Sequence, residues 1–127
     1  SIPVEIRYLT LLKSLNLSFN SFSRGLPDEV RYISELEYLD VQHNHLSSEL
    51  PRGLGVLSML KHLDLSYNAI TGPIRVRIDQ GYYIFNFYTQ LSYFNLAHNK
   101  MRGEIPIEIQ KASTLEELYL NSNNFDK

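Results

Sequence analysis

Apolar and polar positions alternate along this chain in a short pattern that recurs five times. In each copy, apolar residues stand eight, five and three places before an asparagine, and all fifteen of these positions are filled by leucine, valine or phenylalanine. The asparagines are Asn20, Asn44, Asn68, Asn99 and Asn123, separated by 24, 24, 31 and 24 residues. The last two apolar positions of each copy are two residues apart, which is the period of a strand with one buried face. The pattern therefore predicts about five stacked parallel strands with a shared leucine core.

A second motif follows the asparagines and indicates the type of repeat. It is clearest in Asn99-Lys100-Met101-Arg102-Gly103-Glu104-Ile105-Pro106, and it recurs as Gly25-Leu26-Pro27, Glu49-Leu50-Pro51 and Gly72-Pro73-Ile74. With this motif, essentially the whole chain resembles the plant-type leucine-rich repeat family, whose unit reads LxxLxLxxNxLxGxIPxxLxxLxx. The resemblance implies an α/β solenoid, a right-handed superhelix with a concave parallel β-sheet and little regular helix. Short 3-10 turns, loops and a short second strand are expected on its flank and convex side.

Three positions depart from the family pattern. Arg24 and Ser48 occupy the glycine position of their repeats, and Arg75 occupies a proline position. Glycine permits backbone angles that other residues avoid, and proline presets φ. We therefore expect looser local turns at these positions within an unchanged architecture.

The five asparagines are predicted to be structural. Each stands where the chain leaves a strand and turns inside the coil, which leaves backbone groups in need of partners. A side-chain amide offers two donor hydrogens and one acceptor oxygen, so stacked asparagines can link one coil to the next.

The ends of the chain suggest a single leucine-rich repeat domain fragment over residues 1–127, uncapped at both ends. Ile2-Pro3 fits the tail of an earlier repeat, and the last five residues stop inside the next one. Solenoids normally finish with polar caps. Bare terminal strands are expected here, with a tendency to edge-to-edge self-association.

The 31-residue gap contains a seven-residue insertion, which the alignment of repeats places within residues 79–87. Five aromatic residues fall between positions 82 and 88. Two interpretations stay open. The rings cover the flank of adjoining coils, as bare aromatics would form an adhesive patch, or they shape part of a ligand pocket.

Composition narrows the class of partner. The chain has 12 basic and 14 acidic residues and a net charge of −2, so no broad cationic field points to nucleic acid or anionic lipid. No apolar run reaches the roughly 20 residues of a membrane span. Cysteine is absent, which says little about compartment because secreted repeat proteins often confine disulfides to their caps.

The outward positions of the predicted strands form columns rich in tyrosine and histidine, interleaved with aspartate and asparagine. Such rings give a large contact area with a polar tip, a composition enriched in binding hot spots. The alternative is an ordinary solvated sheet face that uses β-favouring tyrosines. The predicted partner-binding residues are Tyr38, Asp40, His43, His62, Asp64, Tyr67, Tyr93, Asn95 and His98.

Catalytic and metal sites are weakly supported. His62, Asp64 and Ser66 are expected on the solvent face of one strand, but a flat sheet offers no oxyanion hole for a nucleophilic serine. His43 and His98 lie two strand spacings apart, about 9.6 Å, and a metal would need further ligands. We therefore expect no enzyme activity, no metal and no cofactor.

Asn16-Leu17-Ser18 satisfies the N-glycosylation rule. Asn16 is therefore a predicted glycosylation position if the chain is secreted, although such triplets also arise by chance from the repeat itself.

These features favour a protein or peptide recognition module. The family resemblance implies part of a plant receptor-like kinase or receptor-like protein ectodomain, at the extracellular side of the plasma membrane or in the apoplast, with a peptide or protein ligand and a co-receptor as partners. Two alternatives remain: a secreted inhibitor of a cell-wall-degrading enzyme, similar to polygalacturonase inhibitors, and an intracellular scaffold.

Overall fold

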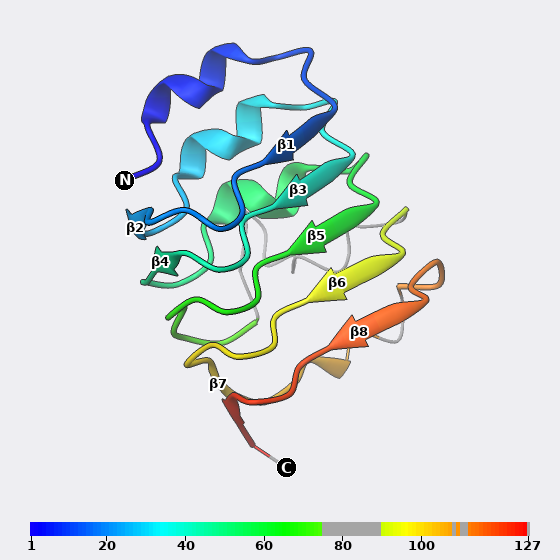
Figure 1. Ribbon diagram of the computed structural model, residues 1–127. Coiled ribbons are helices and arrows are strands. Elements are labelled where there is room, and N and C mark those ends of the chain that lie inside the picture. Colours follow the sequence, from blue (N-terminus) through cyan, green and yellow to red (C-terminus); the bar gives the residue numbers. More distant parts are fainter. Residues whose placement is uncertain (75–89, 108, 110–111, 127) are drawn as a thin grey trace.

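The computed structural model is a stack of coils with a parallel β-sheet on one side and short 3-10 helices on the other (Figure 1). It describes residues 1–74, 90–107, 109 and 112–126. The aromatic insertion predicted within residues 79–87 and the departure at Arg75 lie outside the described residues.

Five three-residue strands build the sheet: Ser14–Asn16 (β1), Tyr38–Asp40 (β3), His62–Asp64 (β5), Tyr93–Asn95 (β6) and Glu117–Tyr119 (β8). They are parallel in the order β1-β3-β5-β6-β8, and Leu63 of β5 pairs with Leu39 on one side and Phe94 on the other. The register follows the repeat, so side chains at one repeat position form a column across the sheet. The predicted stack of strands is confirmed.

Within the described residues, the opposite side of the coils carries three 3-10 helices, Val4–Tyr8 (η1), Asp28–Tyr32 (η2) and Arg52–Val56 (η3). Each begins directly after a proline, and the φ angles of Pro3, Pro27 and Pro51 are −72°, −69° and −76°. Proline suits the start of a helix because its φ is preset and its missing N–H is not needed there. The predicted 3-10 turns are confirmed. None of the helices in the described part of the chain has the length and apolar character to cross a bilayer.

A second strand of two residues follows several of the main strands. Ser23–Arg24 (β2) pairs in parallel with His45–Leu46 (β4), and Arg102–Gly103 (β7) pairs with Asn124–Phe125 (β9). These pairs lie at the flank of the coils, as the family resemblance implies.

The prediction of looser turns at Arg24 and Ser48 is wrong. All four described residues at this repeat position adopt positive φ: Arg24 (64°), Ser48 (66°), Gly72 (77°) and Gly103 (86°). The carbonyls of Arg24 and Ser48 accept from the amides of Ser47 and Thr71 at 2.9 and 3.0 Å. Hydrogen bonds from the next coil therefore hold the backbone in the left-handed region, even where a side chain makes that conformation costly.

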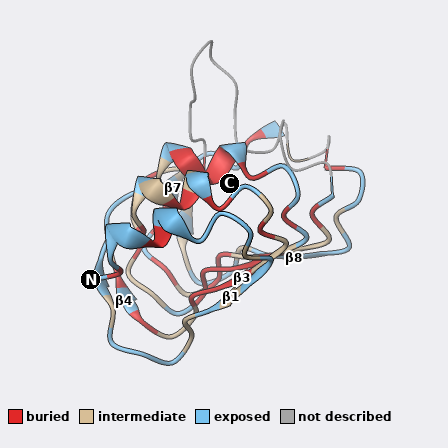
Figure 2. Cartoon of the chain, turned by 90° about the horizontal axis from the view of Figure 1, so that it is seen from above, coloured by how far each residue is buried: buried red, intermediate tan, exposed pale blue. Residues whose placement is uncertain are grey.

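The core fills the space between the sheet and the helices. The buried residues line the inside of the coils (Figure 2). Leu39, Leu63 and Phe94 in the middle strands are 0% exposed, whereas Leu118 in β8 is 37% exposed. Burial of each central leucine contributes about 1.5–3 kcal/mol relative to leaving it in water, so the interior coils carry most of the apolar stabilisation.

Four of the five repeat asparagines link neighbouring coils, and Asn20 does not. Nδ2 of Asn44 donates to the carbonyl of Leu17 in the preceding coil at 2.9 Å, and its Oδ1 accepts from the amide of Phe22 at 3.0 Å. Asn68, Asn99 and Asn123 repeat the same two contacts one coil further on. Asn20 is exposed and bonds only to carbonyls of its own coil, those of Leu17 and Ser18.

Gly53 fixes the spacing between η2 and η3, which makes it a testable position. Its amide donates to Oδ1 of Asp28 at 2.6 Å. A Cβ at this position would clash with the Asp28 carbonyl oxygen and would lie 2.9 Å from Cβ of Arg31. Gly53→Ala is therefore expected to lower the free energy of unfolding by about 1–3 kcal/mol, measured by urea denaturation.

Gly25→Ala is the matched control for this substitution. A Cβ there would lie 3.4 Å from its nearest neighbour, Cβ of Ser48, which is ordinary contact. Its unfolding free energy should stay near that of the unmodified chain, and an equal loss in the two variants would show that the close approach to η2 is not the cause.

Candidate functional site

The candidate site is the concave face, defined as the outward side of the five-stranded sheet together with the turn that follows each strand. Strand register brings the predicted site residues into columns. Tyr38, His62 and Tyr93 are paired across β3, β5 and β6, and so are Asp40, Asp64 and Asn95. His43, Tyr67 and His98 follow in the turns. The structure therefore places all nine residues on the outward side of the sheet, where Asp40 and Asp64 are buried among their neighbours, while their role in binding stays a prediction.

The first aromatic column consists of Tyr38, His62 and Tyr93. The His62 ring stacks on both tyrosines, with centroid distances of 4.4 Å to Tyr38 and 4.2 Å to Tyr93 and interplanar angles of 15° and 3°. The spacing follows from the separation of neighbouring strands, about 4.8 Å. Each ring restricts the rotamers of the next, so the column is a rigid wall.

The second aromatic column consists of Phe19, His43, Tyr67 and His98, one from each of the first four turns. Their rings stack at 4.3, 4.2 and 4.2 Å. All four residues have positive φ, between 55° and 59°. Phe19 is 70% and Tyr67 is 46% exposed, so the edges of this column face solvent. Tyr67 separates His43 from His98, which keeps these two histidines from converging on one ion.

Asp40 and Asp64 lie deeper than predicted. They are 4% and 3% exposed, and Ser66 is 1% exposed. The expectation that Asp64 and Ser66 face solvent is therefore wrong. Hydrogen bonds from the residue two positions later hold both carboxylates against the backbone, and the Tyr93 hydroxyl of the next coil also contacts Asp64. Oδ1 of Asp64 accepts from both the amide and the hydroxyl of Ser66, at 2.9 and 2.6 Å.

The buried position of Ser66 bears on catalysis. Its hydroxyl is committed to the carboxylate of Asp64, and its side chain is shielded from solvent. A nucleophilic serine needs to reach both a base and a substrate. This arrangement argues against a hydrolytic role for His62, Asp64 and Ser66.

The hydroxyls of the first aromatic column contact the carboxylates. Tyr38 donates to Oδ2 of Asp40 and Tyr93 donates to Oδ2 of Asp64, each at 3.3 Å. Burial, reinforced by Asp40, raises the pKa of Tyr38. Burial also raises the pKa of Tyr93, with Asp64 acting in the same direction and the hydrogen bond from Asn95 opposing it. Both phenols are therefore neutral donors at physiological pH.

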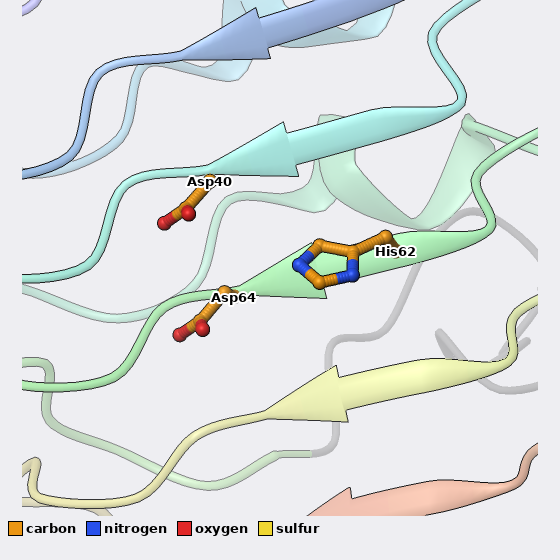
Figure 3. A group of neighbouring side chains, drawn as sticks. All are labelled: Asp40, His62 and Asp64. Carbon is orange, nitrogen blue, oxygen red and sulfur yellow. The ribbon is translucent and has the colours of Figure 1, made fainter.

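Asp40 at the end of β3, with His62 at the start and Asp64 at the end of β5, forms a compact group (Figure 3). Their candidate ligand atoms all lie within 4.8 Å of one another. The sequence had pointed to His43 and His98 as possible metal ligands, and it had not predicted a metal site at Asp40, His62 and Asp64. The proximity of these three side chains could have been predicted from the sequence, because His62 and Asp64 share one face of a strand and Asp40 stands at the same repeat position as Asp64.

The predicted glycosylation position, Asn16, is exposed at the end of β1. Its Oδ1 accepts from the amide and the hydroxyl of Ser18 at 3.0 and 2.6 Å. Glycan attachment at Asn16 stays a prediction.

Comparisons with known proteins agree with the geometry. The sequence profile of the Leucine Rich Repeat family matches residues 11–33, 35–57 and 90–112, and a second Leucine Rich repeat profile matches residues 56–77. Comparison with curated protein sequences gives no significant match.

Several solved structures share the fold. The Arabidopsis receptor kinase HAESA, in complex with the peptide hormone IDA and the co-receptor SERK1, has 29% identity and a TM-score of 0.86. A TDR receptor has 34% identity and a TM-score of 0.87, and a plant ice-binding protein has 30% and 0.81. Each match covers 98% of this chain, which spans 20% of either receptor chain and 45% of the ice-binding protein.

Proposed function

Because the chain belongs to the plant-type leucine-rich repeat family, we propose that it is a ligand-recognition segment of a receptor-like kinase or receptor-like protein ectodomain. In this proposal the concave face binds a peptide or protein ligand, on the extracellular side of the plasma membrane or in the apoplast. The segment has no catalytic activity of its own.

The single observation that carries the proposal is the pair of aromatic columns. Seven rings are stacked at centroid distances of 4.2 to 4.4 Å over four coils. Ligand binding normally costs the entropy of ordering side chains. Rings already held by their neighbours avoid much of that cost, and aromatic residues supply a large share of binding energy at interfaces.

The structural neighbours give a second line of support. HAESA is described as binding a peptide hormone together with a co-receptor. By analogy, we propose a peptide ligand and a co-receptor for the protein that contains this segment. Fold alone does not decide function, since a plant ice-binding protein shares the same architecture. The proposed binding function therefore rests on the side chains of the concave face.

The proposal is tested by selecting random linear peptides from a phage-displayed library on the immobilised chain. The affinities of the selected peptides are then measured for Tyr67→Ala and Tyr93→Ala by isothermal titration calorimetry. Each substitution removes one ring from a column, so we expect affinity to fall about tenfold or more, with circular dichroism showing that the fold is retained.

The matched control is Tyr32→Ala. Tyr32 is also an exposed tyrosine, 53% exposed, but it ends η2 on the convex side. Its removal should leave peptide affinity unchanged. Peptides whose binding survives both concave-face substitutions and is lost in Tyr32→Ala would place recognition on the convex side and overturn the proposal.

A further inference from the structure

We propose that Asp40, His62 and Asp64 form a binding site for a divalent transition-metal ion, with zinc as the best match. The three side chains come from the adjacent strands β3 and β5, and their ligand atoms lie within 4.8 Å of one another (Figure 3). The inference rests on these three residues and does not depend on the proposed peptide-binding function.

The electrostatics of the two carboxylates favour a cation. Asp40 and Asp64 are register partners on neighbouring strands and are 4% and 3% exposed. The ion pairs within the described residues, Arg31–Asp28 and Lys61–Glu37, lie elsewhere. Two buried like charges side by side are costly unless they are paired or coordinate a metal. A divalent ion between them would offset both charges.

The turn after each strand does not need the negative charge of Asp40 or Asp64. Asp40 and Asp64 close a turn by accepting the amide of the residue two positions later, at 3.0 and 2.9 Å. Asn16 and Asn95 occupy the same repeat position and close the same turn with an amide oxygen, at 3.0 and 2.9 Å. A neutral acceptor therefore suffices for the turn, and the carboxylates of the second and third coils are not required for it.

His62 adds a third ligand at the right place. Its column neighbours, Tyr38 and Tyr93, direct their hydroxyls to Asp40 and Asp64, and His62 brings a ring nitrogen into the same region. Among the described residues, the contacts of the imidazole are its two ring stacks, which leave the nitrogens available as ligands. The stacks also fix the plane of the ring, so little freedom is lost on coordination.

The donor set indicates the class of metal. One imidazole nitrogen and two carboxylate oxygens suit zinc and similar ions, whereas calcium and magnesium prefer oxygen ligands alone. Zinc–ligand distances of about 2.0–2.2 Å require the three side chains to close in slightly by rotation. Three protein ligands leave a fourth position for water or for a group of a bound partner.

The carboxylates already have the supporting donors that metal sites use. Oδ2 of Asp40 accepts from Nε2 of Gln42 at 2.8 Å and from the hydroxyl of Tyr38 at 3.3 Å. Tyr93 and Ser66 hold Asp64 in the same way. Such outer hydrogen bonds orient ligands and strengthen metal binding.

The test is titration of zinc chloride into the chelator-treated 127-residue chain by isothermal titration calorimetry, with cobalt(II) absorption as an independent report of coordination. We expect one ion per chain. His62→Tyr removes the nitrogen ligand but keeps a ring of the kind found on both sides in the same column. Asp64→Asn removes one charge but keeps the turn acceptor seen at Asn95. Each is expected to weaken zinc binding by at least about tenfold.

His43→Tyr is the matched control, because it removes a histidine from the second aromatic column, where Tyr67 already tolerates the same positive φ. Its zinc affinity should equal that of the unmodified chain. Circular dichroism checks the fold of every variant. If His62→Tyr fails to fold, the zinc affinity of Asp64→Asn tests the proposed site on its own. Absence of zinc binding to the unmodified chain, or binding that both site variants retain, would overturn the proposal.

Discussion

Phe94→Ala is expected to lower the free energy of unfolding by about 3–5 kcal/mol, the range for removal of a large aromatic side chain from a core. Phe94 is fully buried in β6, between Leu63 of β5 and Leu118 of β8. The backbone around it is tied to both neighbouring coils by the sheet, so the cavity cannot close by local collapse. A loss of this size is a large part of the stability of a small domain. It is measured by urea denaturation followed by circular dichroism.

Two further substitutions serve as controls for the Phe94→Ala prediction. Phe94→Leu restores the residue found at this position in the other four repeats, and it should cost less than about 1.5 kcal/mol. Leu11→Ala removes a side chain that is 78% exposed and should have little effect. If Phe94→Ala were as mild as Leu11→Ala, the shared core of the stacked coils would be refuted.

Asn99→Ala is expected to cost about 2–4 kcal/mol through lost hydrogen bonds. Asn99 is 8% exposed, and its Nδ2 donates to the Leu65 carbonyl at 2.9 Å while its Oδ1 accepts from the Ile70 amide at 3.0 Å. Both partners belong to the preceding coil. Alanine would leave the buried Ile70 amide unpaired, at about 1–3 kcal/mol. The Leu65 carbonyl would keep the bond from Nδ2 of Asn68 at 3.2 Å. The bonds from Asn99 to two carbonyls of its own turn would also be lost. Urea denaturation measures the loss.

Asn20→Ala is the control that distinguishes the stability contributed by hydrogen bonds between coils from that contributed by hydrogen bonds within one turn. Asn20 occupies the same repeat position but is exposed and bonds only within its own coil. Its replacement should cost less than about 1.5 kcal/mol. Equal losses in Asn20→Ala and Asn99→Ala would mean that the contacts between coils contribute nothing, which is the outcome that contradicts the role assigned to Asn99.

The two substitutions probe different sources of stability in the same coils. Phe94 stabilises by excluding water from the interior, and Asn99 stabilises by satisfying backbone groups that the coil shape leaves unpaired. A repeat protein depends on contacts between neighbouring coils, since each coil alone cannot bury its apolar face. Both losses should therefore appear as a weaker junction between adjacent coils.

The repeat pattern predicts the architecture well because its physical signals are local. The spacing of Leu63 and Leu65 defines a strand with one buried face, and Pro27 and Pro51 mark the starts of η2 and η3. Repetition of these signals at a fixed spacing forces the strands into register. The columns of the concave face follow from the register, so the stacking of Tyr38 on His62 could have been predicted from the sequence.

Other features depended on contacts that single repeats do not reveal. Arg24 and Ser48 suggest loose turns by their residue type, but hydrogen bonds from the following coil hold them in the glycine conformation. Asp64 and Ser66 alternate with buried leucines and suggest a solvent face, but both are buried, and the Tyr93 hydroxyl of the next coil contacts Asp64. In both cases a contact between coils outweighs the local preference.

The sequence by itself determined the fold, the number of coils, the asparagine ladder and the residues that share the concave face, because each of these is set by the period of one repeating unit. Only the tertiary structure decided how deep each side chain lies and which groups meet across strands. It buries Asp40 beside Asp64, brings His62 to both, and commits Ser66 to a carboxylate. Burial and proximity depend on the distances between coils, and those distances are fixed only when the coils pack.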